Sequence, residues 1–168
     1  GMSKWKIVNE RASAHDLSGA DLSAVNLSGA NLSGVKLRDA SLHLTYLHEA
    51  TLSRADLRGA EMSRAVLSEA DLSGADLSAA NLSWVDLTGA NLFGAKLVRA
   101  NLKGASLRMD GLSRADLQGT HLTNTDLQRA RYSADTKWPE GFDPKAAGAW
   151  LVEDGDEPAA GTVEVRIG

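Results

Sequence analysis

A large apolar residue recurs at every fifth position through most of the chain. The series begins at Leu17 and ends at Tyr132, and Leu fills every position except those of Met62 and Tyr132. Two residues before each large apolar residue stands a smaller one, most often Ala, and the residue between them is usually Asp or Asn. Ser and then Gly commonly follow the Leu. Residues 15–134 are therefore twenty-four consecutive units of five residues each.

A period of five residues fits neither an amphipathic helix nor a regular strand. Five residues of α-helix turn by about 500°, so successive Leu side chains would step about 140° around the axis and form no apolar face. In a strand, whose side chains alternate, every second Leu would point to the opposite side. Within one unit, however, the Ala and the Leu lie two residues apart and share one side, and the Asp or Asn between them points outward. Ser-Gly is typical of turns, so each unit predicts a short extended step followed by a corner.

Repetition of this unit predicts a coil that keeps Ala and Leu inside and stacks on the next coil about 4.8 Å away. The units Ala20-Asp21-Leu22-Ser23-Ala24, Ala30-Asn31-Leu32-Ser33-Gly34 and Ala70-Asp71-Leu72-Ser73-Gly74 resemble the pentapeptide-repeat family. The resemblance covers residues 15–134 and implies an all-β fold, a right-handed quadrilateral parallel β-helix with four units in each coil. Twenty-four units then form about six coils and a rod roughly 30 Å long.

The distribution of charge favours four units per coil independently of the resemblance. Lys36 and Lys96 are the two Lys residues in the outward position before the large apolar residue. The residues twenty positions away from them in either direction are all acidic: Asp16, Asp56, Asp76 and Asp116. At spacings of fifteen or twenty-five residues the neighbours are less uniformly acidic. Opposite charges attract when they lie side by side on adjacent strands.

Residues 1–14 and 135–168 flank the repeats, and we expect both segments to cap the solenoid, whose ends otherwise expose apolar side chains and unpaired backbone. In the first segment Gly1, before Met2, is interpreted as a tag residue, and Trp5, Ile7 and Val8 are expected to cover the first coil. In the second segment we expect a plug, a short helix beginning near Asp143 and Pro144, and a terminal strand from Thr162 to Ile167. The residues expected to fill the plug are Trp138, Phe142, Trp150 and Leu151. The segment TKWPEGFDP also resembles the tail of many pentapeptide repeats, which implies a cap, although a dimerisation element remains the alternative.

The composition of the chain indicates which kinds of partner and which cellular compartment to expect. The net charge is −4, and only 5% of the residues are aromatic, so the core is expected to be aliphatic and no nucleic-acid-binding surface is indicated. The chain has no Cys, which excludes disulfides and thiolate metal sites. No run of apolar residues is long enough to cross a membrane, and the first fifteen residues lack the apolar segment of a signal peptide. We therefore expect a cytoplasmic protein.

The residue types that carry catalysis or bind metals recur as part of the repeat. Ser stands after Leu in many units, and this repetition indicates a turn residue, because a catalytic Ser would be a singular residue with a base beside it. His43 and His48 follow Leu one unit apart and are expected to point outward as solvated surface residues, with no acidic cluster to complete a metal site. His121 is also outward, and His15 is interpreted as a cap residue. We expect no catalytic residue, no metal and no cofactor.

A few inward positions hold polar residues in place of Ala. Asp110 takes one of these positions, and a lone buried carboxylate is costly. Either the coil bulges at Asp110, or Asp110 accepts backbone hydrogen bonds, or it marks a functional site. Thr120 and Thr125 take inward positions nearby, so we expect a more polar interior in the last coils.

Outward apolar residues provide the best indication of a binding surface. With four units per coil, Leu44, Arg64 and Trp84 stack in one column at a corner, and Tyr46 and Val66 stack in the next column. Exposed aromatic residues beside Arg are typical of protein interfaces. We therefore predict that these five residues bind a protein partner. Arg64 over Trp84 as a plain surface contact, and coverage of the patch by the tail, remain alternatives.

The oligomeric state stays open between monomer and homodimer. Phe93 and Val98 form a second, smaller group of outward apolar residues, which we predict as a dimer contact.

Two functions follow from these features. The first is a non-enzymatic protein-interaction or scaffold module whose partner is not identified. The second comes from the resemblance, because some pentapeptide-repeat proteins protect DNA gyrase from quinolones as dimeric rods that mimic DNA. DNA carries about one negative charge per 1.7 Å of its length, whereas thirteen acidic and twelve basic residues from Asp16 to Tyr132 leave a net charge of −1. We therefore favour the interaction module.

Overall fold

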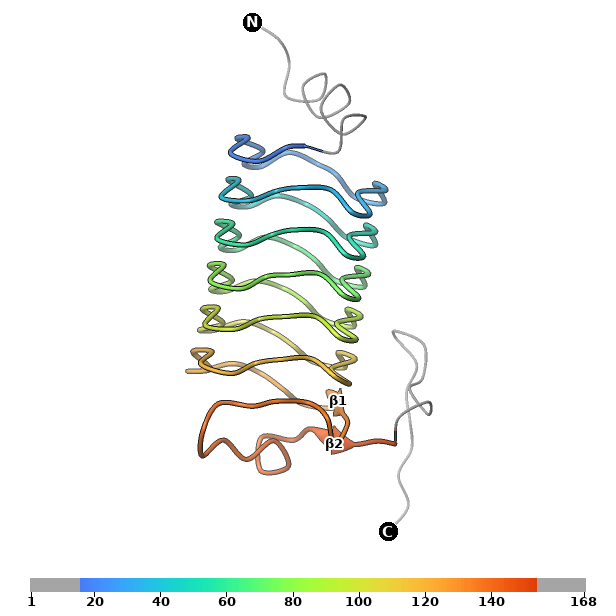
Figure 1. Ribbon diagram of the computed structural model, residues 1–168, viewed down its shortest axis with the longest axis vertical. Helices are drawn as coiled ribbons and strands as arrows, with labels where there is room; N and C mark the ends of the chain where they lie inside the picture. Colours follow the sequence, from blue (N-terminus) through green and yellow to red (C-terminus); the bar gives the residue numbers. More distant parts are fainter. Residues whose placement is uncertain (1–15, 154–168) are drawn as a thin grey trace, which may run out of the picture.

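The chain forms a rod of stacked coils, which the computed structural model describes for residues 16–153 (Figure 1). Parallel backbone bridges join residues twenty positions apart along the series, from Asp16 with Lys36 to Gly111 with Arg131. Each coil therefore contains four units, one on each side of the rod. The predicted fold, a right-handed quadrilateral parallel β-helix of the all-β class, is confirmed. The described segment forms no helix, and thus none that is long and apolar enough to span a membrane.

The hydrogen bonds of one unit explain its residue preferences. In the unit that contains Asp71, the carboxylate Oδ1 accepts a hydrogen bond from the N–H of Ser73 at 3.0 Å. The N–H of Ala75 donates to the carbonyl of Leu72 at 3.0 Å, which closes a β-turn. Gly74 in this turn has a φ of +66°, a conformation that Gly adopts without the steric cost of a Cβ. The Asp or Asn side chain thus accepts a backbone hydrogen bond where the turn begins, and Gly adopts the left-handed conformation that the turn requires.

The inward side chains form one continuous core along the rod. Leu72 and Ala75 are fully buried, as are the equivalent residues of most units. The coils are joined by backbone bonds that alternate in direction, such as Leu72 N–H to Asn91 O at 2.8 Å and Asn91 N–H to Ala70 O at 2.9 Å. Most of these pairings are isolated bridges, because each extended step is too short to make a longer strand.

Two short strands close the C-terminal end of the rod. Strand β1 (Arg131–Tyr132) pairs in parallel with strand β2 (Trp150–Leu151), with Arg131 opposite Trp150. The segment between them leaves the regular path before Lys137, which bridges to Asp116 twenty-one rather than twenty positions away. Trp138 stacks on Phe142 with 5.2 Å between the ring centroids, and both rings pack against the core.

Parts of the expected C-terminal cap differ from the structure. The short helix predicted near Asp143 and Pro144 is wrong, since residues 144–148 form turns. The chain has to extend again at β2, where the N–H of Trp150 donates to the carbonyl of Ala130 at 2.7 Å. Leu151 is exposed and does not join the buried part of the plug.

Several expectations for the two ends concern residues outside the described range. These are the caps by Trp5, Ile7 and Val8, the role of His15, and the strand from Thr162 to Ile167.

Polar residues in the inward positions are held by the backbone. Asp110 is fully buried, and its Oδ1 accepts a hydrogen bond from the N–H of Ala90 at 2.9 Å. The register of twenty residues continues through Gly111, so the coil does not bulge there. Thr120 donates to the carbonyl of Leu117 at 2.7 Å. The polar positions are not confined to the last coils, because Thr45 in the second coil is also buried and bonded to a backbone carbonyl.

Candidate interaction surface

One corner of the rod carries bulky side chains on backbone that favours glycine. Leu44, Arg64 and Trp84 occupy the same turn position in three successive coils, and each has a φ of +58°. This left-handed conformation costs a residue with a Cβ about 1 kcal/mol relative to glycine. Gly104 takes the same position in the following coil. The chain therefore presents a Leu and a Trp at positions where glycine would be less strained.

The indole of Trp84 is held between its two neighbours in this column. The guanidinium carbon of Arg64 lies 5.8 Å from the centroid of the Trp84 ring. On the other side the ring covers Gly104 so closely that a Cβ added there would lie 2.5 Å from Cδ2 of Trp84. The indole is thus fixed against the rod by a cation–π contact and by the backbone of the next coil.

Tyr46 and Val66 continue the apolar surface around the corner. A parallel bridge joins Tyr46 to Val66, so these two residues stack on one side of the rod, as predicted, and a second bridge joins Val66 to Asp86 in the next coil. The exposed fractions are 44% for Leu44, 50% for Tyr46 and 49% for Trp84, whereas Val66 is half-buried. We refer to Leu44, Tyr46, Arg64, Val66 and Trp84 as the apolar corner.

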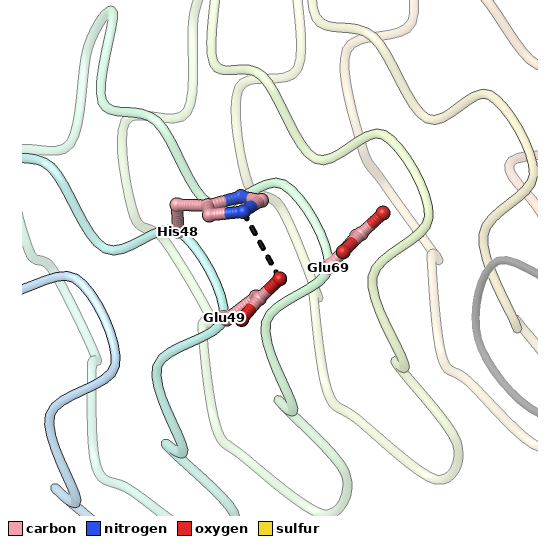
Figure 2. A group of neighbouring side chains, drawn as sticks. All are labelled: His48, Glu49 and Glu69. Atoms are coloured by element: carbon pink, nitrogen blue, oxygen red, sulfur yellow. Dashed lines mark ion pairs between the residues drawn. The ribbon is translucent and has the colours of Figure 1, made fainter.

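The far edge of the same side carries a His and two acidic residues. His48 and Glu49 form the turn after Tyr46, and Glu69 occupies the position of Glu49 in the next coil (Figure 2). Nε2 of His48 lies 3.2 Å from Oε1 of Glu49. The expectation that no acidic cluster accompanies the histidines is wrong, because the twenty-residue register places the carboxylates of Glu49 and Glu69 beside His48. The spacing of twenty between Glu49 and Glu69 was the signal in the sequence.

Both histidines at this part of the rod also contact a Ser of the following coil. Nδ1 of His43 lies 2.7 Å from Oγ of Ser63, and Nδ1 of His48 lies 2.7 Å from Oγ of Ser68. These two Ser residues therefore stand beside a nitrogen base, although both occupy the ordinary turn position of the repeat. His48 and Glu49 remain 46% and 62% exposed, so this chain of hydrogen bonds lies in open solvent.

Acidic and basic side chains pair with each other at a different corner of the rod. Asp56 accepts hydrogen bonds from the guanidinium groups of Arg58 and Arg38. The hydrogen bond from Arg58 is the main cause that lowers the pKa of Asp56 well below its usual range. The two guanidinium groups thus stabilise the ionised carboxylate of Asp56.

The second group of outward apolar residues is smaller. Phe93 is 37% exposed, and the guanidinium carbon of Arg114 lies 5.4 Å from the centroid of its ring. Val98 is half-buried. Phe93 and Val98 stand at the two ends of one side of the rod, with Lys96 between them in the sequence, and their role as a dimer contact stays a prediction.

Comparison with known proteins identifies the family. A family model for pentapeptide repeats matches eight copies in residues 16–54, 45–83, 86–108 and 112–131. The chain belongs to the pentapeptide-repeat family. This confirms the resemblance seen in the sequence. Proteins of this family are in general structural or interaction modules rather than enzymes.

Several solved structures are similar to this pentapeptide-repeat protein. Rfr23, a pentapeptide repeat protein from the cyanobacterium Cyanothece 51142, is 28% identical over 80% of this chain and 99% of its own, with a TM-score of 0.42. A pentapeptide repeat protein from the Arabidopsis thaliana thylakoid lumen is 37% identical over 58% of this chain and 65% of its own, with a TM-score of 0.40. QnrB1, a plasmid-mediated fluoroquinolone resistance protein, is 13% identical over 83% of this chain and 92% of its own, with a TM-score of 0.51. At that identity the likeness shows the fold alone. No curated protein matches the sequence.

Proposed function

We propose that this pentapeptide-repeat protein is a non-enzymatic interaction module that binds a protein partner at the apolar corner. The observation that carries the proposal is the clustering of exposed apolar side chains. The exposed large hydrophobic residues of the described segment are Leu44, Tyr46, Trp84, Phe93 and Leu151. The first three lie together at one corner and on the side that adjoins it.

A partner that binds at the apolar corner would bury exposed apolar surface. Burial of apolar surface is the dominant favourable contribution in most protein–protein association. A Trp held in place before binding loses little side-chain freedom when the complex forms, and Trp84 is already fixed by Arg64 and Gly104. Trp, Tyr and Arg are also the residues that most often dominate the binding energy of protein interfaces. The rigid rod therefore offers a preformed anchor.

Two further features support a module without catalytic activity. Ser hydroxyls of neighbouring coils bond to one another, as Ser53 does to Ser33 at 3.1 Å, which fits a structural role. The pair of His48 and Ser68 is exposed and the pair of His43 and Ser63 is only partly buried, whereas catalytic groups act best where water is excluded.

The alternative function, a DNA-mimicking regulator of gyrase, has less support. The likeness to QnrB1 carries the fold alone, and the net charge of −1 from Asp16 to Tyr132 gives the rod little of the charge of DNA. We keep it as one identifiable outcome of the capture experiment.

The proposal is tested by affinity capture from a lysate of the source organism. The wild type is compared with a variant that carries Leu44→Ser, Val66→Ser and Trp84→Ser. A Phe93→Ser variant serves as the matched control, because Phe93 is also an exposed aromatic residue under an Arg. All proteins are first checked for equal circular dichroism and elution volume. We expect a partner that the wild type and Phe93→Ser retain and the triple variant loses. Equal capture by all three proteins would overturn the proposal, and loss with Phe93→Ser alone would move the interface to that side.

A further inference from the structure

We propose that His48, Glu49 and Glu69 bind a divalent transition-metal ion such as Zn²⁺, which bridges the second and third coils. Each residue offers one ligand atom, and the three atoms lie within 4.8 Å of one another. Figure 2 shows the imidazole above the carboxylate of Glu49, with Glu69 on the adjacent coil. The site is separate from the apolar corner and does not depend on the proposed partner.

The backbone of the repeat places the two carboxylates side by side. Glu49 and Glu69 take the same turn position in successive coils, with φ values of +58° and +57°. Their side chains therefore leave the rod in the same direction, one coil apart, which is about 4.8 Å. The equivalent positions of the coils on either side hold Gly29 and Gly89, which bring no charge. Two like charges stacked in this way repel each other unless a cation lies between them.

A neighbouring hydroxyl orients the imidazole of His48. Nδ1 of His48 lies 2.7 Å from Oγ of Ser68. When Nδ1–H donates to this hydroxyl, the lone pair of Nε2 points toward Glu49, whose Oε1 is 3.2 Å away. In the other neutral tautomer the proton sits on Nε2 and faces Glu49, so a metal ion bound at Nε2 would take the place of that proton. A hydrogen bond to the second ring nitrogen is also how proteins commonly fix a metal-binding His.

The donor set suits first-row divalent ions. Zn²⁺ takes imidazole nitrogen and carboxylate oxygen at about 2.0–2.2 Å, and three protein ligands leave positions for water. Ligand atoms around one ion lie about 3–4 Å apart, so the side chains have to close by about 1 Å from the present arrangement. His48 and Glu49 are 46% and 62% exposed, and Glu69 is exposed too, so they can move without disturbing the core.

The chain contains an internal control for this geometry. His43 stands one unit earlier, and its Nδ1 makes the same 2.7 Å contact with Ser63 that His48 makes with Ser68. The positions that hold Glu49 and Glu69 beside His48 hold Leu44 and Arg64 beside His43. Leu is no ligand, and Arg repels a cation. A His in this setting should therefore bind metal only where the two carboxylates accompany it.

The test is calorimetric titration of the full chain with zinc chloride, in a buffer that does not bind metal. The variants are His48→Ala, Glu69→Gln and, as the matched control, His43→Ala. We expect one saturable site in the wild type and in His43→Ala, and at least about tenfold weaker binding in His48→Ala and Glu69→Gln. The absence of saturable binding, or equal binding by the wild type and His48→Ala, would overturn the proposal. Circular dichroism before titration identifies a variant that has lost its fold.

A gain-of-site variant keeps the proposal testable if the deletions perturb the coil. Leu44→Glu combined with Arg64→Glu rebuilds the arrangement of Glu49 and Glu69 beside His43. We expect a second ion per chain in this variant and its loss when His43→Ala is added. A variant that binds no additional ion would contradict the rule that the two carboxylates complete the site.

Discussion

Replacement of Asp110 by Ala should stabilise the protein at neutral pH. Asp110 stands in an inward position that holds Ala in most units, and its side chain is completely buried. One carboxyl oxygen accepts the N–H of Ala90, but Oδ2 has no hydrogen-bond partner. The substitution restores the residue that the repeat prefers and removes a buried polar group.

The size of the effect follows from three contributions. An unsatisfied buried oxygen costs about 1–3 kcal/mol, and the hydrogen bond to Ala90 returns about 0.5–1.5 kcal/mol. The N–H of Ala90 also donates to the carbonyl of Leu87 at 2.9 Å, so the substitution does not leave it unpaired. The small space left by the carboxyl costs about 1 kcal/mol. With the carboxyl protonated these contributions nearly cancel, so the difference near pH 3 should be small.

The gain at neutral pH comes from ionisation. Burial raises the pKa of Asp110 well above its ordinary value of 3.8, although Arg131 nearby opposes the shift. Between 3.8 and the raised pKa the folded protein binds a proton that the unfolded chain releases, so the stability of the wild type falls as the pH rises. Each pH unit in this window costs about 1.4 kcal/mol. We expect Asp110→Ala to be more stable than the wild type at pH 7 by at least about 1.4 kcal/mol, the cost of one pH unit in this window.

The assay is urea denaturation of both proteins, followed by circular dichroism from pH 3 to pH 8. The difference between the two proteins isolates Asp110, because every other titratable group is common to both. Asp56, whose pKa is lowered, contributes stability that is lost as the pH falls. A difference that does not change with pH, or a variant that is less stable at pH 7, would refute the reasoning. It would show that Asp110 is ionised in the fold and balanced by Arg131.

Three further predictions concern the core, the apolar corner and the Ser68 pair. Leu72→Ala, in a fully buried position, should lower the free energy of unfolding by about 2–5 kcal/mol in urea titrations; a loss below about 1 kcal/mol would contradict a close-packed core. Gly104→Ala should cost about 1 kcal/mol, because the φ of +69° disfavours a Cβ, and should shift the indole NMR signal of Trp84, whose ring covers this position; an unmoved signal would show that the ring lies elsewhere. Ser68→Ala should hydrolyse p-nitrophenyl acetate at the same rate as the wild type, and a slower variant would reveal a nucleophile.

The coil could be predicted from the sequence, because the five-residue period of Leu and the twenty-residue register of the charges both follow from the geometry of the backbone. A Leu at every fifth position requires a corner in every unit, and the acidic neighbours of Lys36 and Lys96 indicated the twenty-residue register that the bridges show. That register also stacks Leu44, Arg64 and Trp84 in one column, as predicted. The position of a residue within its unit decides the side of the rod on which its side chain lies. The coil, its register and this column could therefore be predicted without knowledge of contacts between residues distant in the sequence.

The contacts between side chains of adjacent coils and the path of the C-terminal cap could not be predicted. The contacts depend on side-chain rotamers, and the cap lies beyond the end of the repeat. The bonds from His43 to Ser63 and from His48 to Ser68 join adjacent coils, and the repeat consensus does not require them. The turn near Asp143 has helix-compatible residues, but the pairing of Trp150 with β1 sets its backbone. Tertiary pairing overrides a local preference in such a segment.

The central claim, that a protein partner binds the apolar corner, is tested most directly by site-specific photocrosslinking. A photoreactive phenylalanine analogue replaces Tyr46 in one protein and Phe93 in a second, and both are irradiated in a lysate of the source organism. Both positions are exposed and aromatic, so the two probes differ mainly in the side of the rod from which they react. The account predicts a discrete crosslinked protein from position 46 and none of the same mass from position 93. No crosslink from position 46, or the same products from both positions, would contradict it.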